Sequence, residues 1–455
     1  MEDYKSSGTH QKVDIVSDEN DEDHRKLNDI CLGLIKYTNA GKSLFIISKI
    51  AELTQFLCNS SESEYDVLIE KEIPQLLLNL FNLTSKTEEY RPVTYCMIQI
   101  YRKAHSTHDF FESPFFIENL IQIDGCQQAK IDCIVQILHE VVDNLQKHSL
   151  HEPLSELFSI SLLENLAQNT TNDDSLASIM LIAKAFSSLI TDKEAGSNYL
   201  KFIRANIMRG QEKSTCIMID MLSDLINRLI FVNETFISEG FIPILVEYFR
   251  LFKNGIGNSA AGFISLYLEK VGDEFPIDIE ILEKILLDNS IYHEFPDYYF
   301  NVSKVMCLLV INNQEIVQKY INSELIYKLI SSIDNYTANI QSSIIRTISS
   351  CIFQSNADLF KIILKSINSI QIIFELITRG IEYCNEYVTG PVLFALHNML
   401  LLAQNDESIG KVVYENISSC IPGSDISDIE IESEDIEALI DKILNLSPYS
   451  EEGNE

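Results

Sequence analysis

The run Gly240-Phe241-Ile242-Pro243-Ile244-Leu245-Val246 shows the pattern on which the fold of this chain depends. Ile242 is followed by apolar side chains three and four positions on, at Leu245 and Val246. Residues at that spacing lie on one face of an α-helix. The run therefore predicts a short helix that buries one side.

The same spacing returns along the chain at intervals of 37 to 47 residues, with copies that begin at Ile73, Ile117, Leu163, Leu200, Ile242, Leu282, Ile326 and Ile373. Each copy is followed by a second amphipathic stretch, which is clearest between Ile131 and Leu145. Residues 27–58 have the character of an earlier half-repeat. A helix pair this short cannot bury its apolar face alone, so successive pairs must stack. No stretch alternates with a period of two, so no sheet is expected.

Both ends of the chain differ from this pattern. Residues 1–26 are polar, acidic and aperiodic, which predicts a disordered tail. Residues 27–420 form the predicted repeat domain, and residues 421–455 are predicted to be a second acidic tail. A short amphipathic helix is expected around Ser433–Leu446, with its apolar face made by Ile436, Leu439, Ile440, Ile443 and Leu444.

The formal charge of the chain is −33 at pH 7. Such a charge repels phosphate backbones and anionic membrane surfaces, so nucleic acid is not an expected partner. Basic segments of other proteins are the natural electrostatic partners of an acidic surface. The longest apolar run, Met306–Ile311, is far shorter than the roughly 20 residues of a membrane span, so no membrane insertion is expected.

The 10 cysteines are scattered, and most of them fall in apolar stretches. They are expected to be reduced, buried thiols, which favours the cytoplasm or the nucleus as the location. The chain is expected to be monomeric on its own.

The segment from Phe231 to Val246 resembles the turn and second helix of the armadillo family, in which Gly-x-Ile-Pro-x-Leu-Val is typical. Ile73-Pro74 matches the same place, although Glu72 stands where that family has glycine. The run Val392–Met399 resembles the family's third helix. The resemblance covers about residues 27–418. It implies a right-handed superhelical α-solenoid of about eight armadillo- or HEAT-like repeats.

Within that family the closest functional comparison is the importin-α type of nuclear import adaptor, whose groove uses a Trp and Asn ladder on successive third helices. Here only Asn398 keeps the asparagine, and Trp is absent. The resemblance places Gln99, Glu140, Ser188, Asp224, Cys307 and Ser350 at the other asparagine positions.

Two local motifs have residue types that occur in catalytic or metal-binding sites. The run Gly255-Ile-Gly257-Asn-Ser259-Ala-Ala-Gly262 lacks the Gly-Lys-Ser/Thr ending of a phosphate loop and the spacing of a nucleophile elbow, so it favours a helix–helix turn. His105 and His108, three residues apart, could supply two metal ligands, but a zinc site needs a third and a fourth ligand. No catalytic residue, metal site or cofactor is predicted, and the chain is not expected to be an enzyme.

The N-terminal tail contains Val13-Asp-Ile15-Val16 followed by acidic residues, and it resembles a SUMO-interaction motif. Such a run could add as a strand to the sheet edge of a partner. A solvated tail is the alternative interpretation of the same residues.

The sequence predicts a protein-interaction scaffold or adaptor. A peptide or partner helix would lie along a concave surface made by the third helices, in contact with Gln99, Glu140, Asp224, Tyr267 and Asn398. Two alternatives remain open at this point: a divergent import adaptor that binds basic localisation signals, and a regulatory subunit of a larger enzyme complex.

Overall fold

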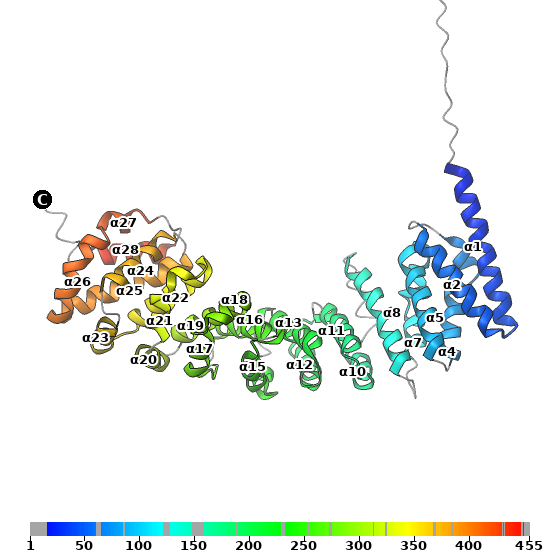
Figure 1. Cartoon of the computed structure of the whole chain (residues 1–455), viewed down its shortest axis with the longest axis horizontal. Helices are drawn as coiled ribbons and strands as arrows, with labels where there is room; N and C mark the ends of the chain where they lie inside the picture. The colour runs from blue at the N-terminus through cyan, green and yellow to red at the C-terminus, as the bar shows by residue number, and fades with distance from the viewer. Residues whose placement is uncertain are drawn as a thin grey trace, which may run out of the picture. The chain divides into compact units, whose positions relative to one another are not determined.

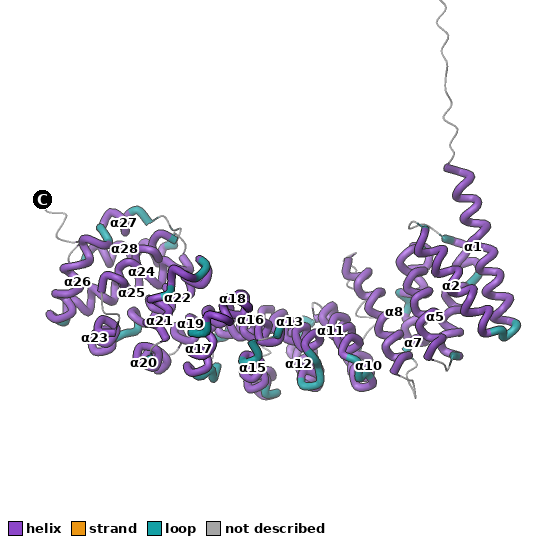
Figure 2. The backbone as a smooth tube through the Cα atoms, viewed as in Figure 1, coloured by secondary structure: helices purple, strands orange, loops and turns teal. Residues whose placement is uncertain are grey.

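The structure is a computed structural model of the whole chain. It describes residues 16–449 except for gaps at 61–64, 85–86, 122–127, 148–158, 188–189, 229–232, 253, 273–274, 313, 324, 367–369, 384–385, 430, 432 and 447–448. Within these described residues every regular element is a helix, as Figure 2 shows. The chain divides into two compact units, and the boundary between them runs through the helices α12 (Lys193–Ile207) and α13 (Glu212–Arg228).

Unit 1 comprises residues 1–191 and 205–217. Its helices are α1 (Val16–Asn39), α2 (Ser43–Asn59), α3 (Asp66–Glu70), α4 (Ile73–Leu83), α5 (Thr87–Lys103), η1 (His105–Thr107), α6 (His108–Phe111), α7 (Pro114–Leu120), α8 (Gln128–Lys147), α10 (Ile160–Asn169) and α11 (Asp173–Ser187).

Unit 2 comprises residues 192–204 and 218–455. Its helices are α14 (Asn233–Ser238), α15 (Phe241–Phe249), α16 (Gly255–Lys270), α17 (Ile279–Leu286), α18 (Asn289–Glu294), α19 (Pro296–Asn312), α20 (Gln314–Asn322), α21 (Leu325–Ser331), η3 (Ile333–Asn335), α22 (Ala338–Phe353), α23 (Ala357–Ser366), α24 (Ile370–Glu382), α25 (Glu386–Asn405), α26 (Glu407–Cys420), α27 (Gly423–Ser427) and α28 (Glu434–Leu444).

The longest helix of each repeat, which we call the third helix, packs beside the third helix of the next repeat. In unit 1 the order of neighbours is α2, α5, α8 and α11. In unit 2 it is α16, α19, α22 and α25 (Figure 1). Each apolar face is thus covered by the adjacent repeat, as in the predicted α-solenoid, and the stripe from Ile131 to Leu145 is buried as expected.

Several helices are capped at the N-terminus by the side chain of the preceding residue. Asn254 precedes α16, and its Oδ1 accepts a hydrogen bond from Gly257 N at 3.3 Å. Asp406 precedes α26, and its Oδ1 accepts from Ser408 N at 3.0 Å. Such caps satisfy backbone N–H groups that have no partner within the helix. The glycine-rich run Gly255–Gly262 therefore forms the first turns of α16, whereas the sequence favoured a turn between two helices.

The two Ile-Pro helices, α4 and α15, begin after a residue in the left-handed conformation. Gly240 has φ +73° before α15, and Glu72 has φ +52° before α4. Among the described residues Glu72 is the one non-glycine residue with positive φ. A side chain in this region costs roughly 1–2 kcal/mol, which glycine avoids.

We expect Glu72→Gly to stabilise unit 1 and Gly240→Ala to destabilise unit 2, each by about 1 kcal/mol. Glu72 is exposed, and a methyl group on Gly240 would meet no atom within 4 Å. Backbone strain alone therefore decides whether each substitution raises or lowers the free energy of unfolding. Urea denaturation of the two variants measures the effect. If both substitutions stabilised the protein, or both destabilised it, the explanation by backbone strain would be wrong.

The predicted N-terminal tail is shorter than expected, because α1 begins at Val16 and covers residues 16–26. The helix then continues into Leu27, Ile30, Cys31 and Leu34, which are buried. An acidic composition did not exclude a helix here, because exposed acidic side chains such as Glu22 and Asp23 are compatible with one.

The C-terminal segment packs against the last repeat, which corrects the prediction of a tail. α28 lies against α25, in the place that the next third helix would take. Its residues Ile436, Leu439, Ile440 and Ile443 are buried, which matches the predicted apolar face, while Leu444 is only partly covered. Glu434, Asp435 and Glu437 remain exposed on the opposite side. A helix with one apolar and one charged face is what the end of a repeat stack requires.

Candidate partner-binding surfaces

Gln99 and Glu140, two of the predicted contact residues, come together in unit 1 where α5 lies beside α8. They line a hollow of 560 Å³ together with Arg102. Arg102 donates from Nε to Glu140 Oε2 at 2.8 Å and from Nη2 to Glu140 Oε1. Glu140 is therefore already paired, and Gln99 is only 6% exposed. The two residues are neighbours in the structure, but neither is a fully open contact group.

A second hollow of 380 Å³ lies across α5, α8 and α11, and none of its lining residues was among the predicted contact residues. Tyr95 lines it with half of its surface exposed, beside Arg91 and Asp132. Asp132 accepts hydrogen bonds from Ser175 Oγ at 2.6 Å and from Gln128 Nε2 at 2.8 Å. The available signal was the spacing of Arg91 and Tyr95, which puts both on one exposed helical edge.

Tyr267 does not lie on a surface, so its predicted contact role is wrong. Its side chain is fully buried in α16, and its hydroxyl donates to Asn233 Oδ1 at 2.6 Å. The rings of Phe236 and Phe275 pack against it with centroids 5.2 and 5.5 Å away. A tyrosine combines a large apolar ring with one polar atom, so a single buried acceptor makes burial favourable.

Asn398 and Asp224 remain near the surface of unit 2, each half-buried. The Asn398 amide donates to Ile352 O at 2.8 Å and to Ser355 O at 3.1 Å. It thereby satisfies carbonyl groups at the end of α22 that have no partner within that helix. Asp224 lies in α13, and burial together with the charge of Asp224 raises the pKa of the Tyr199 hydroxyl. Asn398 thus holds two helices together.

The tail motif cannot be placed in the same way. Val13 and Ile15 lie outside the described residues, and Val16 is the first residue of α1.

A hollow in unit 2 lies where one repeat has no first helix. The preceding repeat has α14 in this position and the following repeat has α20. Between α16 and α17 the described residues Phe275–Asp278 are not helical. Pro276 explains the difference, because the residue before a proline is biased away from the helical conformation. Ile277 N donates instead to Phe275 O at 2.8 Å, which closes a three-residue turn.

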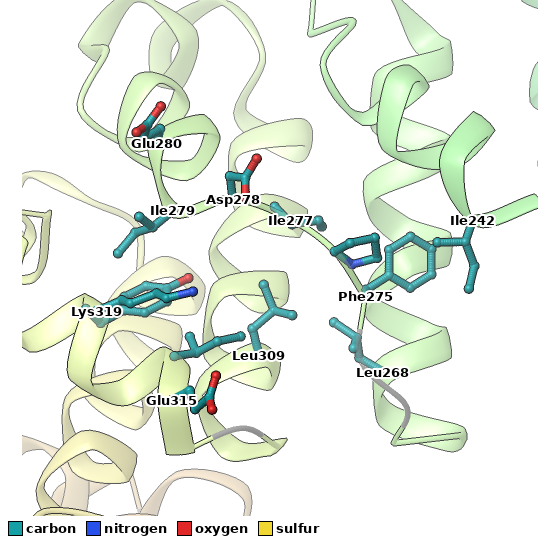
Figure 3. A pocket seen from close by; sticks show the side chains of 13 residues that line it. Ile242, Leu268, Phe275, Ile277, Asp278, Ile279, Glu280, Leu309, Glu315 and Lys319 are labelled. Carbon is teal, nitrogen blue, oxygen red and sulfur yellow. The ribbon is translucent and has the colours of Figure 1, made fainter.

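We call this hollow the first-helix gap, and Figure 3 shows its lining. Its volume is 770 Å³. Apolar side chains line it from both flanking repeats: Ile242, Leu268, Phe275, Ile277, Ile279, Leu309 and Ile316. Its charged members are Asp278, Glu280, Glu315 and Lys319, three acids against one base. Tyr320 also lines it, and its buried hydroxyl has no hydrogen-bond partner in the described part of the chain.

An apolar hollow with an acidic rim suits a ligand that carries apolar and basic groups. The signal for this gap was present in the sequence, because residues 271–278 (VGDEFPID) lack the helical spacing that other repeats have there. The spacing of apolar residues can indicate that a helix is missing here. It cannot indicate that the place of that helix remains open.

No group of three or more His, Cys, Asp or Glu side chains in the described ranges is arranged to hold a metal ion. His105 and His108 lie close, with ring centroids 5.1 Å apart, and His108 Nε2 is 2.9 Å from Tyr101 O. None of the described helices is both long and apolar enough to cross a bilayer.

Comparisons with known proteins support the fold and do not name a family. No family model and no curated protein sequence matches the chain. Among solved structures, an engineered protein matches with a TM-score of 0.63 and 10% identity, over 93% of this chain and 98% of that one.

A second match is Kap95p, in a structure with RanGDP that concerns nuclear import complex assembly. It has a TM-score of 0.46 and 12% identity over 91% of this chain, which spans 56% of the Kap95p chain. Fold and comparison together define this protein as an α-solenoid of helical repeats.

Proposed function

We propose that this protein is a non-enzymatic interaction scaffold that binds a segment of a partner protein. The first-helix gap is the observation that carries the proposal. A repeat that lacks one helix leaves apolar side chains of its neighbours lining an open hollow, and a segment supplied by another protein can cover them. A surface that only contacts solvent would gain nothing from apolar side chains lining an open hollow.

The chemistry of the gap supports a partner segment with apolar and basic residues. Asp278 and Glu280 are exposed at its rim, and the whole chain carries a charge of −33. Long-range attraction guides a basic segment to such a surface, and rim carboxylates pair with its lysines or arginines. The apolar lining then contributes the burial of an aliphatic or aromatic side chain.

We propose, further, that the repeats are of armadillo type. Three-helix repeats such as α20–α21–α22 and α23–α24–α25, together with the left-handed residue before each Ile-Pro helix, support this subfamily. The import-adaptor alternative has no structural observation in its favour, because the single ladder asparagine, Asn398, is engaged with α22. A regulatory subunit would be one form of the same scaffold.

The test is selection of peptides from a random dodecapeptide phage library on the immobilised full-length chain. We expect enriched peptides to combine an apolar residue with neighbouring Lys or Arg. The double change Asp278→Lys and Glu280→Lys is expected to weaken their binding about tenfold, because both rim charges become repulsive. Fluorescence anisotropy of a selected peptide measures the change.

A matched control carries Glu194→Lys and Glu415→Lys, which alter the net charge equally at exposed positions elsewhere in unit 2. Equal loss of binding in both double variants would show bulk charge rather than a site. Failure to enrich any peptide class in repeated selections would refute the scaffold proposal.

A further inference from the structure

The third-helix face of α22 and α25 contains a buried arginine that has no polar partner in the described part of the chain. Arg346 lies in the middle of α22 and is only 7% exposed. Its Nε and Nη1 atoms have no hydrogen-bond partner among the residues that the structure describes. A buried ion normally needs a counter-charge or several hydrogen bonds, so this arrangement is unfavourable for the unbound protein.

One aromatic ring covers the arginine. The guanidinium carbon of Arg346 lies 3.3 Å from the centroid of the Tyr387 ring on α25. Tyr387 itself is 44% exposed, so its other face is open to solvent. This cation–π contact offsets part of the cost of burial but satisfies none of the N–H donors. Rotation of one exposed tyrosine side chain would therefore uncover two nitrogen atoms whose N–H groups have no acceptor.

Charges around the arginine do not supply its partner. Arg346 is the one charged residue of α22. On α19, Lys304 pairs with Glu269 at 2.9 Å. On α25, Glu386 accepts a hydrogen bond from Ser433 Oγ at 3.3 Å. In a chain of charge −33, this third-helix face thus has at its centre a positive group with no ion-pair partner among the described residues.

An apolar contact point lies on the same stripe. Phe353 and Phe394 stand seven residues beyond Arg346 and Tyr387, which is two helical turns or about 10 Å. Their rings lie 5.3 Å apart, and both side chains are well exposed, at 48% and 39%. A partner segment that reaches both points must therefore present an acidic group and an apolar group about 10 Å apart.

We propose that the face formed by Arg346, Tyr387, Phe353 and Phe394 binds an acidic segment of a partner protein, whose Asp or Glu carboxylate pairs with Arg346 and whose aromatic or aliphatic side chain packs on the two phenylalanines. Tyr387 turns aside to admit the carboxylate. This site deepens the scaffold function proposed above and rests on it. The first-helix gap is proposed to bind basic residues, whereas this face binds acidic residues.

The test uses the same dodecapeptide library on the full-length chain, with Arg346→Met and Tyr387→Phe as the variants. We expect a class of peptides rich in Asp or Glu beside an aromatic residue. Their binding should weaken about tenfold or more in Arg346→Met, because a charge-assisted hydrogen-bond pair is lost. Tyr387→Phe keeps the ring over the arginine and should retain binding.

Thermal unfolding distinguishes a binding role from a structural one. Because an unpaired buried charge is replaced by an apolar side chain of similar length, Arg346→Met should melt at the same temperature as the unchanged chain or higher. A lower melting temperature would assign Arg346 to the core and overturn the proposal.

The remaining outcomes separate this proposal from the scaffold proposal. Basic peptides without an acidic class would overturn the Arg346 site and leave the scaffold intact, whereas the absence of both classes would remove both. Acidic peptides that bind Arg346→Met equally well would place their site elsewhere. Tighter binding of acidic peptides after deletion of residues 1–23, which hold eight acidic residues against Lys5 and Lys12, would identify the chain's own acidic end as the occupant, against a partner protein.

Discussion

Deletion of residues 423–455 is expected to lower the melting temperature of unit 2 strongly and to cause aggregation. α28 buries four isoleucine and leucine side chains against the last repeat: Ile436, Leu439, Ile440 and Ile443. Burial of side chains of this size contributes roughly 1.5–3 kcal/mol each, so the loss is of the order of 5 kcal/mol or more. That is a large part of the free energy of unfolding of an ordinary domain.

Aggregation follows from the surface that the deletion uncovers. A cap helix shields the apolar face of the last repeat, and a repeat stack without its cap presents that face to other molecules. Differential scanning calorimetry and size-exclusion chromatography measure the two effects. The control is deletion of residues 450–455, which leaves α28 and Tyr449 in place. Identical melting of the 423–455 deletion and the full chain would restore the interpretation of this segment as a solvated tail.

Gly257→Ala and Gly262→Ala, two substitutions in the same helix, are expected to change stability in opposite directions. A methyl group on Gly257 would lie 2.2 Å from the carbonyl oxygen of Leu251, which is backbone and cannot move aside without shifting the preceding chain. The shift would also break the bond from Gly257 N to Asn254. We expect a loss of about 2–3 kcal/mol from such overpacking.

Gly262 has no such contact, because its nearest neighbour would be Asn301 Nδ2 at 3.6 Å, an ordinary distance. Alanine there should stabilise α16 by about 0.5–1 kcal/mol through its helix propensity. Chemical denaturation of both variants measures the two free energies of unfolding. If both alanines stabilise, the close approach of Gly257 to Leu251 is not a real constraint on the fold.

The predicted contact residues show where sequence reasoning ends. Asn398 and Tyr267 both fall on third helices, as the repeat alignment required. However, the acceptors of Asn398 lie 43 and 46 residues earlier in the chain, and the acceptor of Tyr267 lies 34 residues earlier. Helical periodicity indicates which face of a helix is turned inward. It does not indicate which atoms of the neighbouring repeat meet that face.

The sequence by itself determined the class of fold, because the spacing of apolar residues depends only on the 3.6-residue turn of the helix and recurs with every repeat. It also determined the amphipathic character of α28. Only the tertiary structure decided that α28 is packed, that Pro276 leaves an open gap, that Tyr267 is core and that two nitrogens of Arg346 have no hydrogen-bond partner among the described residues. These features depend on contacts between repeats some 40 residues apart, where the local pattern contains no information about distance.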